Sequence, residues 1–177
     1  MKADVATYSV WMIPEEPDLT DLSNRVRDFA DAYGTPSFVP HMTLMGDLAG
    51  EEAELVALLD RLSSGFSCHN LTVTGVKTED LFFKSLYLDL SVPLALVREQ
   101  AALAEGLPAS QRPRDFQPHI SIAYGPIKPE IKATETKDLK NLIGKTLRFR
   151  YLHLVKSSQK VPIEDWETLQ SFGLKTY

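Results

Sequence analysis

The sequence repeats the stretch Phe38-Val39-Pro40-His41-Met42-Thr43-Leu44 as Phe116-Gln117-Pro118-His119-Ile120-Ser121-Ile122. Both copies read phenylalanine, any residue, proline, histidine, apolar residue, hydroxyl residue, apolar residue. A proline is tolerated at the first residue of a strand, where its missing N–H removes a donor only at the start of the ladder. We therefore expect each histidine near the beginning of a strand.

Side chains of a strand alternate between its two faces. The first copy then places His41 and Thr43 on one face, and the second copy does the same with His119 and Ser121. The apolar residues between them face a core. Two such strands lying side by side would line one cleft with two imidazoles and two hydroxyls, so we predict that these four residues are catalytic.

A lone His-x-Thr in a strand is more often a half-buried polar pair than a catalytic site. The second copy of the pattern favours catalysis, and a duplicated structural unit without activity is the alternative. Metal binding is disfavoured because neither histidine has a carboxylate, cysteine or second histidine at ligand spacing, and hydroxyls are poor zinc ligands. A serine nucleophile is disfavoured because Ser121 lacks the Gly-x-Ser-x-Gly elbow. We expect no metal and no other cofactor.

The composition predicts a single domain over residues 1–177. A chain of 177 residues, 44% of them hydrophobic, is long enough for one core or for two small lobes that share one. The net charge of −5 and the sequence pI of about 5.4 argue against stable binding to long nucleic acid. A small anionic ligand in a local pocket meets no such objection.

Cys68 is the only cysteine, which excludes an internal disulfide and is typical of a reducing compartment. The N-terminus continues directly into a strand pattern without the apolar run of a signal peptide. No stretch approaches the ~20 apolar residues of a membrane helix. We expect a cytoplasmic monomer without membrane contact.

Helical and strand patterns alternate along the chain, which indicates an α+β fold with helices layered on sheet. We expect strands at residues 8–13, 41–45, 71–77, 82–90, 119–124, 147–156 and 167–174. We expect a first helix that is capped by Asp18 or Thr20 and ends at the cluster 33–36, and further helices at residues 51–62, 93–107 and 130–143. The third helix should turn its apolar residues inward, namely Leu94, Val97, Ala101 and Leu103.

The paired motifs resemble the signature of the two-histidine phosphoesterase superfamily. Other segments are similar to its cyclic phosphodiesterase branch, known from plants and yeast: Tyr8-Ser9-Val10-Trp11 leading to Pro14, Phe38-Val39-Pro40, Phe82-Phe83, Tyr124 and Trp166-Glu167-Thr168. The resemblance covers nearly the whole chain. It implies a bilobal α+β fold in which two pseudosymmetric lobes of antiparallel sheet, with outer helices, surround a central cleft. Any disulfide of the plant members cannot form here, since Cys68 stands alone.

The resemblance also implies an activity, which is metal-independent hydrolysis of small cyclic phosphodiesters to the ring-opened phosphomonoester. The implied substrates are ADP-ribose 1″,2″-cyclic phosphate and nucleoside 2′,3′-cyclic phosphates. This reaction needs a base for the attacking water and an acid for the leaving oxygen, and histidine titrates near neutrality. For the family's usual direction we assign His119 as the base and His41 as the acid. The hydroxyls of Thr43 and Ser121 would donate to the non-bridging oxygens.

Candidate substrate-binding residues come from the strand pattern. Phe83, Ser85 and Tyr87 would share the cleft-facing side of one strand, and Ser9 and Trp11 would share a face of another. For each aromatic residue, plain core packing is an equal alternative.

Three further candidates lie near the second motif. Tyr124 resembles a phosphate contact of the family, although strict alternation turns it toward the core unless Gly125 ends the strand. Arg112 and Arg114 lie on a proline-rich loop that could close over a pyrophosphate or a second phosphate. The alternative for both arginines is simple solvation.

Two other functions are compatible with the motifs. One is RNA-end processing or hydrolysis of a cyclic oligonucleotide, against which the acidic pI argues. The other is a nucleotide-binding module without catalysis, against which the intact histidines and hydroxyls of both copies argue.

Overall fold

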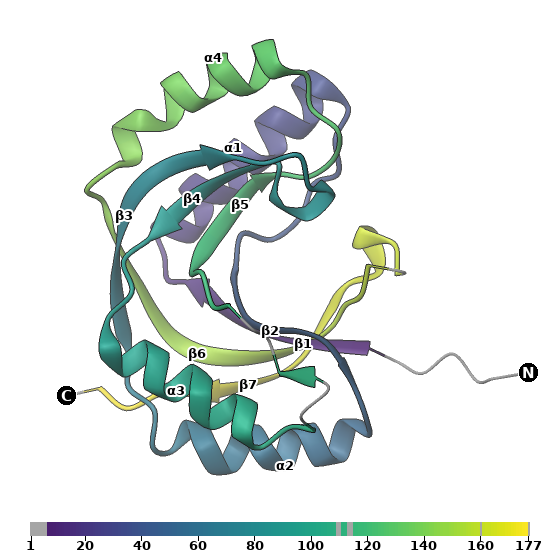
Figure 1. Ribbon diagram of the computed structural model, residues 1–177, viewed down its shortest axis with the longest axis vertical. Helices are drawn as coiled ribbons and strands as arrows, with labels where there is room; N and C mark the ends of the chain where they lie inside the picture. Colours follow the sequence, from purple (N-terminus) through teal and green to yellow (C-terminus); the bar gives the residue numbers. More distant parts are fainter. Residues whose placement is uncertain (1–6, 109–110, 113–114, 160, 177) are drawn as a thin grey trace, which may run out of the picture.

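The computed structural model describes residues 7–108, 111–112, 115–159 and 161–176 (Figure 1). Within these ranges the strands are β1 (Thr7–Pro14), β2 (Met42–Ala49), β3 (His69–Thr78), β4 (Leu86–Leu90), β5 (His119–Ala123), β6 (Thr146–Lys156) and β7 (Glu167–Gly173). The α-helices are α1 (Asp18–Tyr33), α2 (Glu52–Ser63), α3 (Leu94–Glu105) and α4 (Pro129–Leu139). Strands and helices occur in the order that the sequence predicts, which confirms the α+β class.

All strands pair antiparallel in one sheet, in the order β2-β1-β6-β3-β4-β5, with β7 beside β6. The long strand β6 joins the two halves of this sheet. It pairs with β1 along one edge, and along the other it pairs first with β3 and then with β7. We call β2-β1-β6-β7 the first lobe and β3-β4-β5 the second lobe.

The sheet curls, so that β2 and β5 at the two ends of the strand order come into contact (Figure 1). The helices cover its outer faces: α2 packs on β6 and β7, α3 on β2, α1 on β5 and α4 on β3. The first helix therefore covers the second lobe, although the strand before it belongs to the first. This arrangement leaves the inner side of the curl for a cleft.

The first helix shows how local sequence produces this packing. Its buried residues recur at helical spacing and face the sheet: Leu22, Val26, Phe29 and Ala30. It ends at Gly34, whose φ of 68° is a conformation that glycine adopts without steric cost, and whose N–H donates to the carbonyl of Ala30.

One apolar core extends through both lobes. Residues of nearly every strand and helix belong to the same buried cluster, including Leu48, Leu71, Leu88, Ile120 and Phe149. Within the described ranges, no helix combines the length and apolar character that a membrane span requires.

The face predicted to be buried on α3 is correct at Leu103 and wrong at Leu94, Val97 and Ala101. Leu94 is 61% exposed and Val97 is 38% exposed, whereas Leu96, Gln100 and Leu103 are buried. The buried stripe includes a polar residue, because the Gln100 amide donates to the carbonyl of Leu44 on β2. The spacing of apolar residues alone therefore predicts a face of α3 that is rotated relative to the face that is buried.

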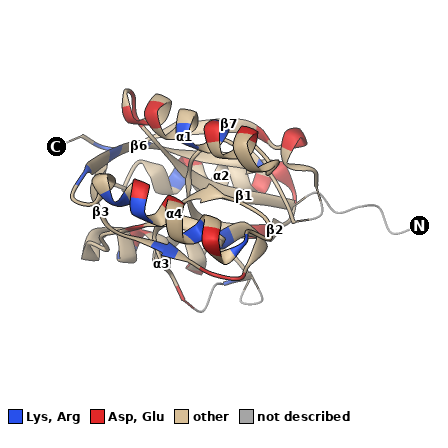
Figure 2. Cartoon of the chain, turned by 90° about the horizontal axis from the view of Figure 1, so that it is seen from above, with Lys and Arg blue, Asp and Glu red and all other residues tan. Residues whose placement is uncertain are grey.

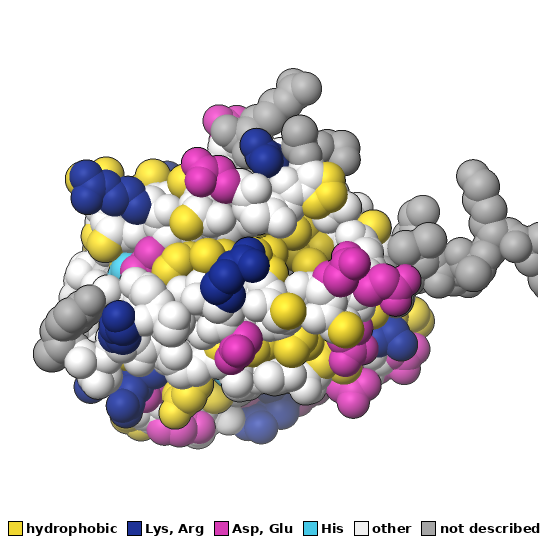
Figure 3. Space-filling model, turned by 90° about the horizontal axis from the view of Figure 1, so that it is seen from below, with side chains coloured by type: hydrophobic (Ala, Val, Ile, Leu, Met, Phe, Trp, Pro, Cys, Tyr) yellow, Lys and Arg dark blue, Asp and Glu magenta, His cyan; other side chains and the backbone are white. Residues whose placement is uncertain are grey.

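Charged residues lie mainly on the outside of the fold. Lysines, arginines and carboxylates are mixed along the outer helices (Figure 2). On the face seen from below, apolar side chains are likewise interspersed with charges of both signs (Figure 3).

Candidate active site

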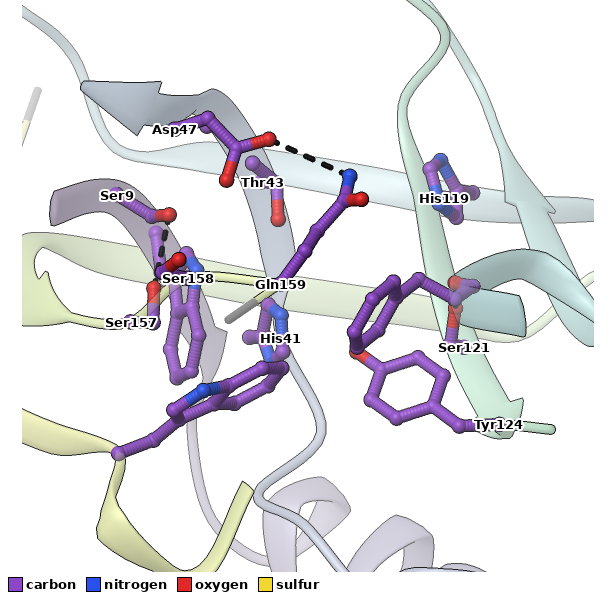
Figure 4. Close-up of a pocket in the computed structure, with 14 residues that line it drawn as sticks. Ser9, His41, Thr43, Asp47, His119, Ser121, Tyr124, Ser157, Ser158 and Gln159 are labelled. Carbon is purple, nitrogen blue, oxygen red and sulfur yellow. Dashed lines mark hydrogen bonds between the residues drawn. The ribbon is translucent and has the colours of Figure 1, made fainter. Parts of the chain in front are cut away.

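The two copies of the repeat meet in a cleft between the lobes. His41 directly precedes β2, and His119 is the first residue of β5. Figure 4 shows His41 and Thr43 on one side of the cleft and His119 and Ser121 on the other. The cavity contains about 660 Å³ of empty space and is open to solvent; its lining residues are Ser9, Trp11, His41, Thr43, Gly46, Asp47, Phe83, His119, Ser121, Tyr124, Ser157, Ser158, Gln159 and Trp166.

Both imidazoles are held by the same backbone interaction. Nδ1 of His41 lies 2.7 Å from the carbonyl oxygen of Val39, and Nδ1 of His119 lies 2.8 Å from that of Gln117. A carbonyl oxygen can only accept a hydrogen bond, so we assign the proton of each neutral ring to Nδ1. Nε2 is then the atom on each ring that can take up or deliver a proton.

His41 is buried in an apolar environment. Its ring stacks on Trp11, with centroids 3.5 Å apart and planes inclined by 8°. Burial lowers the pKa of His41 to about 4, against a smaller raising effect of its hydrogen bond to Val39, and the charge of His119 lowers it further. His41 is therefore neutral at pH 7, with Nε2 as a free acceptor.

His119 has charged neighbours. Its ring meets Tyr87 edge to face at 5.2 Å. Burial lowers the pKa of His119 and its backbone hydrogen bond raises it; Lys84 lowers it, and the carboxylates of Asp89 and Glu79 raise it. Burial prevails, so the pKa of His119 lies below its ordinary value, although its two carboxylate neighbours oppose the shift and His41 has no such neighbours.

The hydroxyls of the motifs are arranged differently. Thr43 is half-buried and lines the cleft. Ser121 Oγ donates to the carbonyl of Phe83 at 3.0 Å. A ligand oxygen at this position has to compete with that carbonyl for the Ser121 proton.

Tyr124 turns into the cleft. The strand β5 ends at Ala123, and Gly125 has a φ of 110°, so the alternation of side chains stops before Tyr124. The Tyr124 ring stacks on Phe38 with centroids 3.8 Å apart. Burial raises the pKa of the Tyr124 phenol, which therefore keeps its proton at pH 7.

Aromatic rings form one wall of the cleft. Trp166 lies 5.6 Å from Trp11 and 5.9 Å from Phe83, and Phe83 lies 5.1 Å from Tyr124. Trp166 follows a short 3-10 turn and is fixed by a hydrogen bond from Nε1 to the Val161 carbonyl at 3.2 Å. The sequence singles out Trp166 only through the resemblance, because nothing local indicates that this turn reaches the cleft.

The opposite end of the cleft is polar. Ser157 Oγ donates to Ser9 Oγ at 2.8 Å, and Gln159 Nε2 donates to Asp47 Oδ2 at 3.4 Å (Figure 4). The predicted candidate Ser9 therefore lines the cleft. Ser157, Gln159 and Asp47 were missed, since they lie in a polar connector and at an irregularity of β2 that no local pattern reveals.

Two predicted substrate contacts on the run 82–90 are wrong, because this run is not one strand. Residues Phe82–Lys84 form a 3-10 turn, and β4 begins only at Leu86. Ser85 is 1% exposed, and its hydroxyl donates to the carbonyls of Leu81 and Gly125. Tyr87 is 2% exposed, and its hydroxyl donates to Glu79 Oε1 at 2.7 Å. Ser85 thus fastens the turn, and Tyr87 supports His119 from behind.

The predicted arginine lid is not supported at Arg112. Its Nε and Nη2 bind the carbonyls of Leu107 and Glu105 at 3.2 and 3.3 Å, at the end of α3. These two bonds direct the guanidinium to the helix end instead of the cleft. Arg114 lies outside the described residues.

The cleft is suited to proton transfer on a small ligand. It presents two Nε2 atoms, hydroxyl groups and aromatic surfaces to one cavity. In the described part of the chain, no three histidine, cysteine or acidic residues are grouped so that they could hold a metal ion.

Three comparisons relate the chain to known proteins. Residues 39–160 match the protein family described as the 2′-5′ RNA ligase superfamily. A cyclic phosphodiesterase from Arabidopsis thaliana is 24% identical over 174 residues, which span 96% of this chain and 94% of that protein. Escherichia coli LigT in its apo form has a TM-score of 0.65 at 15% identity, and LigT complexed with 3′-AMP has one of 0.63 at 16% identity; both alignments span 98% of this chain and 100% of LigT. The structural similarity confirms the predicted bilobal fold.

Proposed function

This chain belongs to the 2′-5′ RNA ligase superfamily of two-histidine phosphoesterases, and we propose that it is a metal-independent cyclic phosphodiesterase. The observation that carries the proposal is the pair of imidazoles in one cleft, both with Nδ1 bonded to a backbone carbonyl. As an enzyme it hydrolyses phosphodiesters. The name of the Arabidopsis relative supports the cyclic phosphodiesterase branch.

Ring opening needs two proton transfers. The base takes a proton from water as the water oxygen bonds to phosphorus, and the acid gives its proton to the ribose oxygen as the bond from phosphorus to that oxygen breaks. Two groups whose environments separate their pKa values are suited to these two tasks. Burial lowers the pKa of both rings, but Asp89 and Glu79 oppose this shift at His119, whereas no carboxylate opposes it at His41. We therefore assign His41 as the base and His119 as the acid, which reverses the assignment based on the resemblance.

Hydroxyl groups stabilise the charge that develops on the phosphate. Thr43 lines the same cleft, and the Tyr124 phenol keeps its proton. Ser121 can exchange its bond to the Phe83 carbonyl for one to a non-bridging oxygen. The aromatic wall offers its faces to a nucleobase. The proposed partner is a small cyclic phosphate, taken by a monomer in the cytoplasm.

The direct test is hydrolysis by the metal-free protein. The protein is incubated in the presence of a chelator with 2′,3′-cyclic AMP and with ADP-ribose 1″,2″-cyclic phosphate. Phosphorus NMR then identifies the products. We expect a ring-opened phosphomonoester; an unchanged cyclic phosphate in both reactions would contradict the proposal.

Variants of the two histidines test the mechanism. We expect His41→Ala and His119→Ala each to lower kcat by about 10²- to 10⁴-fold, the usual value of a positioned acid or base. His153→Ala is the matched control, because His153 bonds Ser171 on β7 and does not line the cleft. Wild-type turnover by either cleft variant, with the fold intact by circular dichroism, would end the mechanism.

A further inference from the structure

The described residues that line the cleft include no lysine or arginine. Among these described lining residues, the only acidic side chain is that of Asp47. Sites that bind several phosphates usually present arginine or lysine to them. The described lining instead opposes the entry of additional negative charge, because its one acidic group is not matched by a lysine or an arginine.

A β-bulge directs Asp47 into the cleft. The register of β1 and β2 shifts between the pairs Tyr8↔Leu48 and Val10↔Met45, so that Gly46 and Asp47 bulge out of the ladder. Asp47 has a φ of 52°, in the left-handed region that residues other than glycine, asparagine and aspartate rarely adopt. Bulges recur next to active sites, where they redirect a side chain.

Gln159 holds the Asp47 carboxylate in this position. Its amide donates to Asp47 Oδ2 from the segment that follows β6 (Figure 4). An amide is neutral, so this bond fixes the carboxylate without neutralising its charge.

Two described lysines near His119 are paired with acids. Lys84 Nζ lies 2.9 Å from Glu79 Oε1, and Lys77 Nζ lies 2.6 Å from Asp89 Oδ2. Both pairs belong to the wall behind His119. Their positive charge is compensated locally, and neither lysine lines the cleft.

We propose that Asp47 restricts the cleft to substrates with a single negative charge, namely nucleoside 2′,3′-cyclic phosphates with a free 5′-hydroxyl. This inference rests on the proposed function and narrows its substrates. A hydroxyl or amino group can donate to the Asp47 carboxylate, whereas a phosphate group near the same place is repelled. Substrates with further phosphates, including ADP-ribose 1″,2″-cyclic phosphate and RNA ends, are therefore poorer ones.

The test compares two substrates that differ by one phosphate group. These are adenosine 2′,3′-cyclic phosphate and its 5′-phosphorylated form, assayed for kcat/KM with the wild type, Asp47→Asn and Asp28→Asn. Asparagine tolerates the left-handed conformation, so Asp47→Asn removes the charge and keeps the bulge. Asp28 is an exposed carboxylate on α1 and serves as the matched control.

We expect the wild type to prefer the substrate without the 5′-phosphate. Asp47→Asn should raise kcat/KM for the 5′-phosphorylated substrate by about three- to tenfold, the effect of one unit charge at the rim of a solvated cleft. Added salt should reduce the preference of the wild type. Asp28→Asn should leave the preference unchanged.

Two results would overturn the role of Asp47. One is equal use of both substrates by the wild type, and the other is an Asp47→Asn variant that lowers both rates alike, as a purely structural residue would. Calorimetric binding of adenosine 3′-monophosphate and adenosine 3′,5′-bisphosphate separates this proposal from the proposed function. If the protein binds the monophosphate more tightly than the bisphosphate but hydrolyses neither cyclic substrate, the role of Asp47 stands and the proposed enzyme activity is refuted.

Discussion

At the scale of single residues, burial of His41 links the stability of the fold to pH. Its pKa is lowered from 6.5 to about 4 because the ring is removed from water and stacked on Trp11. Above pH 6.5 this group is neutral in both the folded and the unfolded chain. Below that pH the unfolded chain binds the proton first, so the free energy of unfolding falls between pH 6.5 and about 4.

We predict that His41→Gln weakens this pH dependence. In the wild type the imidazole contributes a loss of up to about 1.4 kcal/mol per pH unit within that window. Glutamine does not titrate and removes this contribution. Urea unfolding of both proteins at about pH 7 and about pH 5 measures the difference, and equal losses in the two proteins would refute the prediction.

The acid and base roles can be separated with a sulfur-substituted substrate. In this analogue of adenosine 2′,3′-cyclic phosphate, the bridging oxygen that leaves is replaced by sulfur, which departs as a thiolate without a proton. We expect the analogue to rescue His119→Ala by at least about tenfold relative to the oxygen substrate, since that variant lacks the acid. His41→Ala should show no rescue. Rescue of His41→Ala alone would restore the assignment based on the resemblance.

Residues of the site differ in how far the sequence predicts them. His41 and His119 are predictable because the bond that orients each ring reaches a carbonyl two residues earlier, within the motif itself. Asp47 depends on a bulge defined by pairing with β1, and Trp166 depends on the path of a distant turn. Their positions follow from tertiary structure, which no local pattern reports.

At the scale of elements, the stripe of α3 that packs on the first lobe provides a stability test. Leu96 is fully buried, whereas Leu94 on the same helix is 61% exposed. We predict that Leu96→Ala lowers the free energy of unfolding by about 2–5 kcal/mol through the cavity that it leaves. Leu94→Ala should change it by no more than about 0.5 kcal/mol. Urea unfolding of the two variants measures these losses. A larger loss for Leu94→Ala than for Leu96→Ala would support the buried face that the apolar pattern predicts.

Element boundaries show where sequence patterns lose information. The strand period of residues 82–90 is interrupted because Ser85 binds the carbonyls of Leu81 and Gly125, a contact with the end of β5. The helix α1, in contrast, has apolar residues at regular spacing and a glycine after its last residue, and its predicted end agrees with the structure; its start does not, because Pro17 takes the cap position expected for Asp18 or Thr20. Local signals therefore determine α1, whereas a contact with a distant segment determines where the strand in residues 82–90 begins.

At the scale of the whole molecule, the shared sheet and core predict cooperative unfolding. Residues of both lobes belong to one buried cluster, and β6 pairs with strands of both. Both tryptophans of the chain, Trp11 and Trp166, line the cleft, so their fluorescence reports on the interface of the lobes. We predict that urea transitions followed by fluorescence and by far-ultraviolet circular dichroism coincide. Two separate transitions would indicate lobes that unfold independently and would contradict a single domain over residues 1–177.

The architecture was predictable from the sequence largely through the repeat. The repeat predicts two histidine strands that lie side by side, the family resemblance implies the two similar lobes, and the strands β2 and β5 do meet. The order of strands in the sheet and the assignment of helices to lobes were not predictable in this way. They depend on which surfaces fit together, and the sequence specifies those only through contacts between distant residues.

The position of α1 has a consequence for the order of events during synthesis. Its apolar stripe packs on β5, which the ribosome makes only after β2, β3, β4 and two further helices. Until residues 119–123 leave the exit tunnel, α1 can contact β1 but not β5. Contacts between such remote segments close slowly. The nascent chain therefore exposes part of the apolar face of α1 for most of its translation. This face is covered only after the second histidine strand, β5, has been synthesised.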